Sequence, residues 1–234
     1  MQLFYSKDIS KEQLSFVFDK EESKHIIKVL RKQIGDILYV TNGLGYLFKT
    51  EITLASDAKC TVRILEKELK NPCNYNLHMA VAPTKMNERF ELFLEKATEI
   101  GIHQITPIIC DNSERKVIKT ERFEKIILSA MKQSNQCYLP ILNDPITFKN
   151  FIKSNTCSIN YIAHCEETNK RTFKDVFVKE KAICILIGPE GDFSEKEINS
   201  ALEKKYIAVS LGNTRLRTET AALVACHTAK LLNQ

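Results

Sequence analysis

Two stretches decide the fold: AICILIGPEGDFSEKEI, residues 182–198, and VSLGNTRLRTETAALVAC, residues 209–226. Each begins with an apolar run typical of a buried β-strand, and each run ends at a glycine-bearing turn that leads into the start of a helix. In open α/β sheets, ligands bind where loops leave the carboxyl ends of strands. The loops GPEGDFS and LGNTRLRTET are therefore where we expect the functional site.

These loops lack the signatures of common phosphate-binding and hydrolase sites. The turn Gly188-Pro189-Glu190-Gly191 is neither the G-x-G-x-x-G of dinucleotide binding nor a Walker loop, and the chain contains no G-K-[ST] and no G-x-S-x-G. Its two glycines instead permit a tight turn and a close approach of the backbone to a flat ligand. In the second loop, Arg215 and Arg217 favour a polyanionic substrate.

Both loops also end in helix-start signals. Ser194 and Glu197 have the spacing of a capping box. Thr218 and Glu219 are expected to open the terminal helix, with a hydroxyl as its cap and an acid in its first turn. The sequence therefore predicts strand, loop and helix twice in succession.

Upstream, from residue 75, strands and helices alternate. Strands are expected at 76–82, 104–110 and 158–166, and helices at 87–100 and 148–153, a rhythm typical of a mostly parallel α/β sheet. The last of these strands ends at His164, Cys165 and Glu166. His164 and Cys165 either pack at the strand end or line a pocket at the carboxyl edge of the sheet.

Residues 1–70 predict a separate, small β-rich domain with one helix. Short strand-like segments occur at 36–43, 45–55 and 59–68, and Asn42-Gly43 is a strong hairpin signal. The pattern favours a small barrel or curled sheet that holds a partner. The segment KNPCN, residues 70–74, marks the domain boundary.

Basic residues are concentrated in two places. On the helix expected from Lys20 to Arg31, four recur at intervals of three and four and so share one face: Lys20, Lys24, Lys28 and Arg31. Arg115 and Lys116 begin a second concentration in the loop that follows the strand at 104–110. Each is either a contact to nucleic-acid phosphates or a solvated lysine-rich surface.

Composition limits the function without deciding it. The 234 residues are 44% apolar, enough for one or two globular domains, and 34 Lys and Arg against 29 acids give a net charge of +5. The eight cysteines show no C-x-x-C pair and no metal-like spacing to the five histidines, so we expect neither a metal site nor a disulfide framework. The chain shows no signal-peptide pattern and no apolar run of membrane length. We therefore expect a cytoplasmic protein without membrane association.

Taken together, several motifs closely resemble the RsmE family of ribosomal RNA methyltransferases: GPEGDFS, LGNTRLRTETAALVA, HIIKVLR, KMNERFELFLEKATEIGIHQITP and SERKV. The resemblance covers nearly the whole chain. It implies a PUA-like RNA-binding β-barrel at residues 1–70 and, at 75–234, a SPOUT methyltransferase domain, an α/β fold whose parallel sheet ends in a trefoil knot. It also implies a homodimer that uses S-adenosylmethionine to methylate N3 of a uridine in 16S ribosomal RNA of the small subunit.

The resemblance also implies roles for individual residues. The residues expected at the cofactor are His164, Cys165, Glu166, Gly188, Pro189, Glu190, Gly191, Leu211, Gly212, Leu216 and Arg217. Arg217 and Arg215 are both candidates for contacting the target base, and Glu219 either accepts its proton or only caps the helix. Two departures stand out, because Asp192 occupies a position that is glycine in many members and Asn213-Thr214 replaces a common Pro-Arg.

Two other functions fit parts of this pattern. A non-catalytic RNA-binding or ribosome-assembly protein would explain the basic residues, but it would leave the cofactor loops unexplained. A SPOUT enzyme that acts on another RNA base would explain both.

Overall fold

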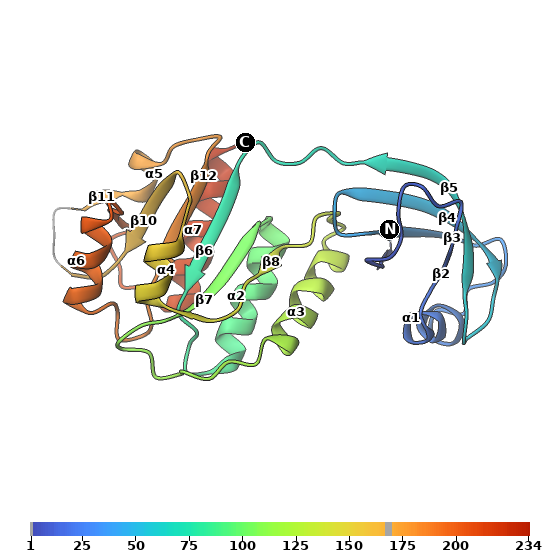
Figure 1. Cartoon of the computed structure of the whole chain (residues 1–234), viewed down its shortest axis with the longest axis horizontal. Helices are drawn as coiled ribbons and strands as arrows, with labels where there is room; N and C mark the ends of the chain where they lie inside the picture. Colours follow the sequence, from blue (N-terminus) through green and yellow to red (C-terminus); the bar gives the residue numbers. More distant parts are fainter. Residues whose placement is uncertain (1, 167–169) are drawn as a thin grey trace. The chain divides into compact units, whose positions relative to one another are not determined.

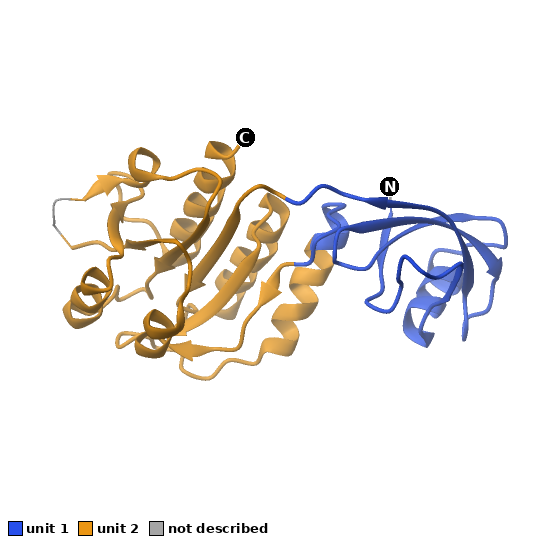
Figure 2. Ribbon diagram, turned by 45° about the horizontal axis from the view of Figure 1, so that its top comes forward, with its two compact units in different colours: residues 1–72, 131–139 blue, residues 73–130, 140–234 orange. Residues whose placement is uncertain are grey.

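The computed structural model describes residues 2–166 and 170–234, and the chain forms two compact units. Unit 1 comprises residues 1–72 and 131–139, and unit 2 comprises residues 73–130 and 140–234 (Figure 2). The sequence suggested two uninterrupted domains, so the return of residues 131–139 to unit 1 is a correction. Its physical cause is backbone pairing, since the Leu139 N–H donates to Gly43 O at 2.9 Å and the Gly45 N–H to Cys137 O at 2.9 Å.

Unit 1 is built on a five-stranded sheet whose strand order is β1-β3-β4-β5-β2. The strands are β1 (Leu3–Tyr5), β2 (Ser15–Val17), β3 (Ile37–Thr41), β4 (Tyr46–Leu54) and β5 (Thr61–Leu69). The pairing of β3 with β4 is antiparallel and confirms the hairpin expected at Asn42-Gly43. The Asn42 Oδ1 stabilises its turn by accepting from the Leu44 N–H at 2.9 Å. Alternate residues of these strands, such as Val40 and Phe48, are fully buried and form the core of the unit.

The helix expected from Lys20 to Arg31 is only partly regular. α1 (Lys20–Lys24) is capped by Asp19, and it continues as the π-helix η1 (His25–Val29). Within η1 the Leu30 N–H bonds to His25 O, five residues back, which rotates later side chains away from the α-helical register. Arg31 follows in a left-handed conformation with φ 55°. The single basic face predicted from the sequence is therefore wrong at its end, because Arg31 does not lie on the helix.

Unit 2 contains an eight-stranded sheet with the order β11-β13-β10-β12-β6-β7-β8, while β9 also pairs with β7. Its pairings are parallel, which confirms the expected α/β fold. The strands are β6 (Asn76–Val81), β7 (Gln104–Ile109), β8 (Ile141–Leu142), β9 (Ile146–Thr147), β10 (Ile159–Ala163), β11 (Arg171–Thr172), β12 (Ala182–Ile187) and β13 (Ile207–Ser210). Central strands β6 and β12 are buried along almost their whole length, as expected for a sheet covered on both faces.

Helices cover the two faces of this sheet (Figure 1). They are α2 (Asn87–Ile100), α3 (Thr120–Gln133), α4 (Phe148–Ser154), α5 (Phe173–Val176), α6 (Glu195–Glu203) and α7 (Thr218–Leu232). α4 and α6 pack through Phe151 and Ile198 onto one face, in a cluster that includes Leu186 of β12. α7 packs with α2 and against β6 and β12. α2 ends at Gly101, whose φ of 105° favours glycine.

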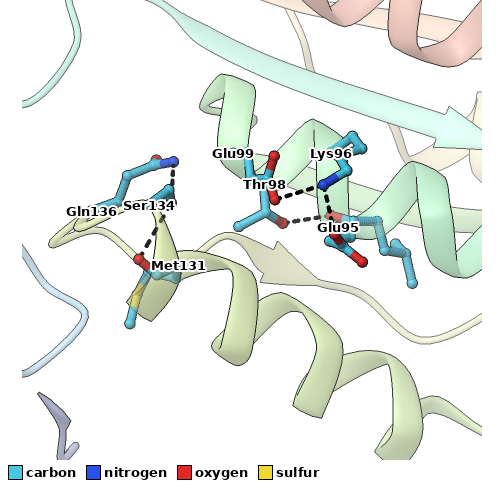
Figure 3. A network of polar contacts seen from close by, with 8 residues as sticks. Glu95, Lys96, Thr98, Glu99, Met131, Ser134 and Gln136 are labelled. Carbon is cyan, nitrogen blue, oxygen red and sulfur yellow. Dashed lines mark hydrogen bonds and ion pairs between the residues drawn. The ribbon is translucent and has the colours of Figure 1, made fainter. Parts of the chain in front are cut away.

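The outer side of α2 is occupied by charged side chains that pair with one another. The Lys96 ammonium lies 2.6 Å from Glu95 Oε1 and 3.0 Å from Glu99 Oε1 (Figure 3). These residues are partly exposed, and ion pairs in contact with solvent contribute little to stability.

Candidate functional site

Three neighbouring strands of unit 2 end at the same edge of the sheet. β10 pairs with β12 through Ala163 and Ile187, and it pairs with β13 through Ala163 and Val209. Since the three strands are parallel, the loops that follow them emerge together. These are the segments after residues 163, 187 and 210, which the sequence singled out.

The loop after β12 is shaped by its glycines and by a capping box. A Cβ on Gly188 would lie 3.1 Å from the Phe193 ring, and one on Gly191 would lie 3.2 Å from Asn112 Cβ. Both positions are therefore too close-packed for a larger residue to enter without displacement. The capping box is confirmed, because the Ser194 N–H donates to Glu197 Oε2 at 2.9 Å and the Glu197 N–H donates to Ser194 Oγ at 3.3 Å.

Two adjoining cavities of about 330 and 380 Å³ open between these loops. Ala163, Cys165, Arg215, Leu216 and Ala221 line both of them. The first cavity is completed by Ile187, Gly188, Pro189, Glu190, Asp192, Arg217 and Thr218, and the second by His164, Lys170, Val209, Ser210, Leu211, Gly212, Asn213 and Thr214. Together they have the size of pockets that hold small ligands and cofactors.

The structure thus brings together most of the residues expected at the cofactor. Among the described residues, the exceptions are Glu166 and Gly191, which line neither cavity. Several lining residues were missed from the sequence, notably Asp192, Thr218 and Lys170. No local pattern marks Lys170, whose ammonium donates to the carbonyl oxygens of His164 and Glu166.

The two candidate arginines stand at the rim of the cavities. Arg215 and Arg217 are both exposed, and within the described part of the chain neither forms an ion pair with a carboxylate. Arg215 lines both cavities and Arg217 lines the first. Their guanidinium groups are thus placed to meet an anionic group or an electron-rich base edge.

The start of α7 differs from the expected helix cap. The N-cap residue is Arg217, with no capping hydrogen bond from its side chain, and Thr218 is already helical. The Thr218 hydroxyl donates to Gly188 O at 3.1 Å, so it joins the two site loops and does not cap its own helix. Glu219 is buried at 7% exposure and lies 3.9 Å from Arg89 Nε. It is not among the described residues that line the cavities.

Burial controls the electrostatics at the end of β10. His164 is 7% exposed, and its burial together with the Lys170 cation holds the pKa of the imidazole below its ordinary value. Burial and the nearby Asp192 carboxylate raise the pKa of the Cys165 thiol, which Arg215 lowers in part. Cys165 therefore presents a neutral thiol to the cavities at physiological pH.

The expected RNA-contacting residues lie outside this site. Lys20 and Lys24 are exposed on α1, whereas Lys28 forms an ion pair of 2.6 Å with Asp57. In unit 2, Lys116 is exposed and the Arg115 Nε donates to Val117 O at 3.3 Å. The exposed Lys20 and Lys24 are thus available to phosphates, while Lys28 would have to exchange its partner.

Within residues 2–166 and 170–234, no group of three His, Cys, Asp or Glu side chains is arranged to hold a metal ion. The eight cysteines are free thiols. Among the described helices, none combines the length and apolar character needed to cross a membrane.

Comparison with known proteins identifies close relatives over the full length of the chain. A family model described as an RNA methyltransferase domain matches residues 70–230, and one described as an RNA methyltransferase PUA domain matches residues 18–65. The ribosomal RNA small subunit methyltransferase E of Buchnera aphidicola subsp. Acyrthosiphon pisum is 31% identical over 231 residues, or 95% of this chain and 90% of the relative.

Two solved structures share this architecture. A protein described as a probable rRNA-methyltransferase from Porphyromonas gingivalis is 40% identical with a TM-score of 0.91, covering 99% of both chains. A ribosomal RNA small subunit methyltransferase E from Neisseria gonorrhoeae, solved bound to S-adenosyl methionine, is 25% identical with a TM-score of 0.85, covering 100% of this chain and 98% of that one.

Proposed function

The chain belongs to the RsmE family of ribosomal RNA methyltransferases, and we propose that it uses S-adenosylmethionine to methylate N3 of a uridine in 16S ribosomal RNA of the small subunit. The observation that carries the proposal is the meeting of the 188–191 turn and the 211–217 loop around the two cavities. The backbone groups and apolar side chains of these two loops suit the flat, uncharged adenine base of the cofactor. The arginines of the second loop suit an RNA substrate. A relative of the same architecture is solved with the cofactor bound.

The residues proposed to hold the cofactor are those expected from the sequence that line the cavities. They are His164, Cys165, Gly188, Pro189, Glu190, Leu211, Gly212, Leu216 and Arg217. Glu166 and Gly191 lie next to this set without lining the cavities. The Glu166 carbonyl oxygen accepts a hydrogen bond from the Lys170 ammonium, and Gly191 packs closely on Asn112. We propose that these side chains orient the cofactor and that backbone groups of the 188–191 and 211–217 loops make polar contacts to it.

When bound, S-adenosylmethionine supplies an electrophilic methyl group on a good leaving group. The protein therefore has to orient the uridine N3 in line with that methyl and to assist the loss of its proton. Arg217 is the first candidate to stabilise the negative charge that develops on the uracil oxygens, and Arg215 is the second. Glu219 or solvent accepts the proton, and the burial of Glu219 beside Arg89 favours solvent.

RNA binding is proposed for both units. Unit 1, with its match to a PUA domain, would hold the RNA through Lys20 and Lys24. Lys28, which is already paired with Asp57, and Arg31, which lies beyond the helix, would contribute less. Arg115 and Lys116 would do so from unit 2. Further parts of the proposal follow from family membership alone: unit 2, residues 73–130 and 140–234, forms a SPOUT domain with a trefoil knot, the chain acts as a homodimer, and it works in the cytoplasm, where ribosomal subunits are made.

The proposal is tested by supplying labelled S-adenosylmethionine to the purified protein with RNA from a strain lacking the endogenous enzyme. Naked 16S RNA and isolated small subunits serve as parallel substrates, and mass spectrometry of digested RNA locates the product. We expect one N3-methyluridine. Methylation of another base would point to a different RNA specificity. Failure to bind the cofactor, with RNA binding intact, would instead indicate a non-catalytic RNA-binding protein.

A further inference from the structure

Asp192 adopts a backbone conformation that side chains other than glycine rarely take. Its φ is 61°, in the left-handed region, directly after Gly191 in the loop that follows β12. This conformation costs an ordinary L-residue roughly 1 kcal/mol, somewhat less for Asp, whereas glycine adopts it freely. A side chain retained at such a position is therefore expected to make a compensating interaction.

The Asp192 carboxylate accepts two hydrogen bonds from backbone N–H groups, one on each oxygen. Oδ2 accepts from the Cys165 N–H at 2.6 Å, and Oδ1 accepts from the Phe193 N–H at 2.8 Å. The Cys165 bond connects the end of β10 to the loop after β12, which are 27 residues apart. Hydrogen bonds to a charged acceptor are about twice as strong as neutral ones.

A third segment joins the same arrangement. The Asn112 amide, in the loop after β7, donates to the carbonyl oxygens of Gly191 and Asp192 at 3.1 Å each. The Asp192 N–H in turn donates to Pro189 O at 2.9 Å, which closes the turn. The backbone of Asp192 is therefore fixed by Asn112 and Pro189, while its carboxylate binds the Cys165 N–H. Both Asp192 and Cys165 line the first cavity.

We propose that Asp192 is a positioning residue for the cofactor: its carboxylate holds the backbone of Cys165 against the 188–191 turn and keeps the cavity in its binding shape before the cofactor arrives. This inference rests on the proposed function. Because the bond is made in the protein itself, its loss weakens cofactor binding and leaves the chemical step unchanged once the cofactor is saturating.

The test compares Asp192→Gly, Asp192→Asn and the unsubstituted protein. Glycine keeps the left-handed backbone without strain and removes only the carboxylate, so the relief of strain offsets part of the stability that is lost with the two hydrogen bonds and the protein remains folded. We expect its dissociation constant for S-adenosylmethionine, measured by calorimetry, to rise roughly tenfold, with an unchanged kcat and a raised KM. Asparagine retains an oxygen for the Cys165 N–H and should show a smaller rise.

Lys205→Gly is the matched control. Lys205 has the same conformation, with φ 64°, but it is exposed after α6 at the opposite end of β13 from the site. It should gain the same backbone relief and keep wild-type affinity.

A second readout is independent of activity. Hydrogen exchange of the Cys165 amide in the cofactor-free protein should speed up in Asp192→Gly and stay unchanged in Lys205→Gly. Equal cofactor affinity in Asp192→Gly and wild type would overturn the positioning role, and so would a loss confined to kcat. Absence of cofactor binding by the unsubstituted protein would overturn the proposed function itself, and this role with it.

Discussion

The hydroxyl of Thr218 donates a hydrogen bond of 3.1 Å to the carbonyl oxygen of Gly188, although 30 residues separate them. Thr218 is 5% exposed, so water cannot readily replace this bond. It fixes the first turn of α7 to the turn after β12, the two elements that enclose the first cavity.

We expect Thr218→Val to weaken both folding and cofactor binding. Valine has nearly the shape of threonine but leaves the Gly188 carbonyl without its partner, which costs about 1–2 kcal/mol. Denaturant unfolding and calorimetry with S-adenosylmethionine measure the two effects. Thr220→Val on the exposed side of α7 is the control and should change neither. Wild-type affinity in Thr218→Val would show that the bond does not shape the cavity.

Arg217→Ala should nearly abolish methylation while the protein remains folded. Removing a group that stabilises charge in the transition state lowers turnover by roughly 100-fold or more. The exposed side chain has no ion-pair partner among the described residues, so the unfolding midpoint should not move. Single-turnover assays at saturating cofactor measure the chemical step. If Arg215→Ala loses methylation in this assay and Arg217→Ala keeps it, Arg215 and not Arg217 stabilises the charge on the base.

Glu219→Gln separates the two roles considered for this acid. Because the carboxylate pairs with Arg89 and does not lie at the cavities among the described residues, we expect turnover near wild type, a lower free energy of unfolding and an unchanged pH–rate profile. An exposed acid elsewhere in unit 2, as in Glu203→Gln, serves as the comparison for stability. A pH–rate profile that loses its acidic limb only in Glu219→Gln would identify Glu219 as the proton acceptor.

Lys20→Ala combined with Lys24→Ala should weaken RNA binding and leave cofactor affinity intact. Each lost phosphate contact reduces the slope of log K against log salt by about 0.7–0.9. Filter binding of 16S RNA at several salt concentrations measures this slope. Lys149→Ala combined with Lys153→Ala, two exposed lysines on α4, controls for net charge. An unchanged slope in the double variant would assign the α1 lysines to a solvated surface.

Stability should fall as the pH is lowered from about 6.5 to about 4. Burial, with a smaller effect of Lys230, lowers the pKa of His103 to about 4. Over this range the unfolded chain binds a proton that the folded protein does not, which favours unfolding. The loss is at most roughly 3.5 kcal/mol, because the two pKa values differ by about 2.5 and each pKa unit is worth about 1.4 kcal/mol.

His103→Asn tests this assignment. An asparagine oxygen can replace the His103 Nδ1 that accepts the Leu77 N–H at 3.2 Å, but it does not titrate. Urea unfolding of both proteins across this pH range should show a shallower dependence in the variant. Parallel curves would assign the acid sensitivity to other groups.

The sequence predicted the elements that carry strong local signals. The apolar runs of β6 and β12, the hairpin after β3 and the capping box of Ser194 are decided by neighbouring residues, and each is confirmed. β8 and β9 have two residues each and no pattern of their own, because they exist only through pairing with β7. The π turn at His25 was missed because it leaves the sequence pattern of a helix intact.

At the candidate site, the loops were predictable and their connections were not. Glycine turns after apolar strands marked where the cavities lie. Thr218 has the sequence signal of a helix cap, but its hydroxyl donates to the Gly188 carbonyl oxygen and does not cap the helix. The role proposed for Asp192 rests on its hydrogen bond to the Cys165 N–H, which no local sequence pattern indicates. Such partners are distant in sequence, so they become visible only when the parallel strands bring their ends together.

The return of residues 131–139 to unit 1 has a consequence for dissecting the protein. The chain passes between the units three times, after residues 72, 130 and 139, so a protease that cleaves only near residue 72 leaves them covalently joined. A recombinant fragment that stops at Pro72 would also lack the Cys137 and Leu139 backbone groups that pair with Gly45 and Gly43. Genetic truncation at the sequence boundary therefore removes a structural part of unit 1, and a faithful minimal version would need residues 131–139 grafted back through a new linker.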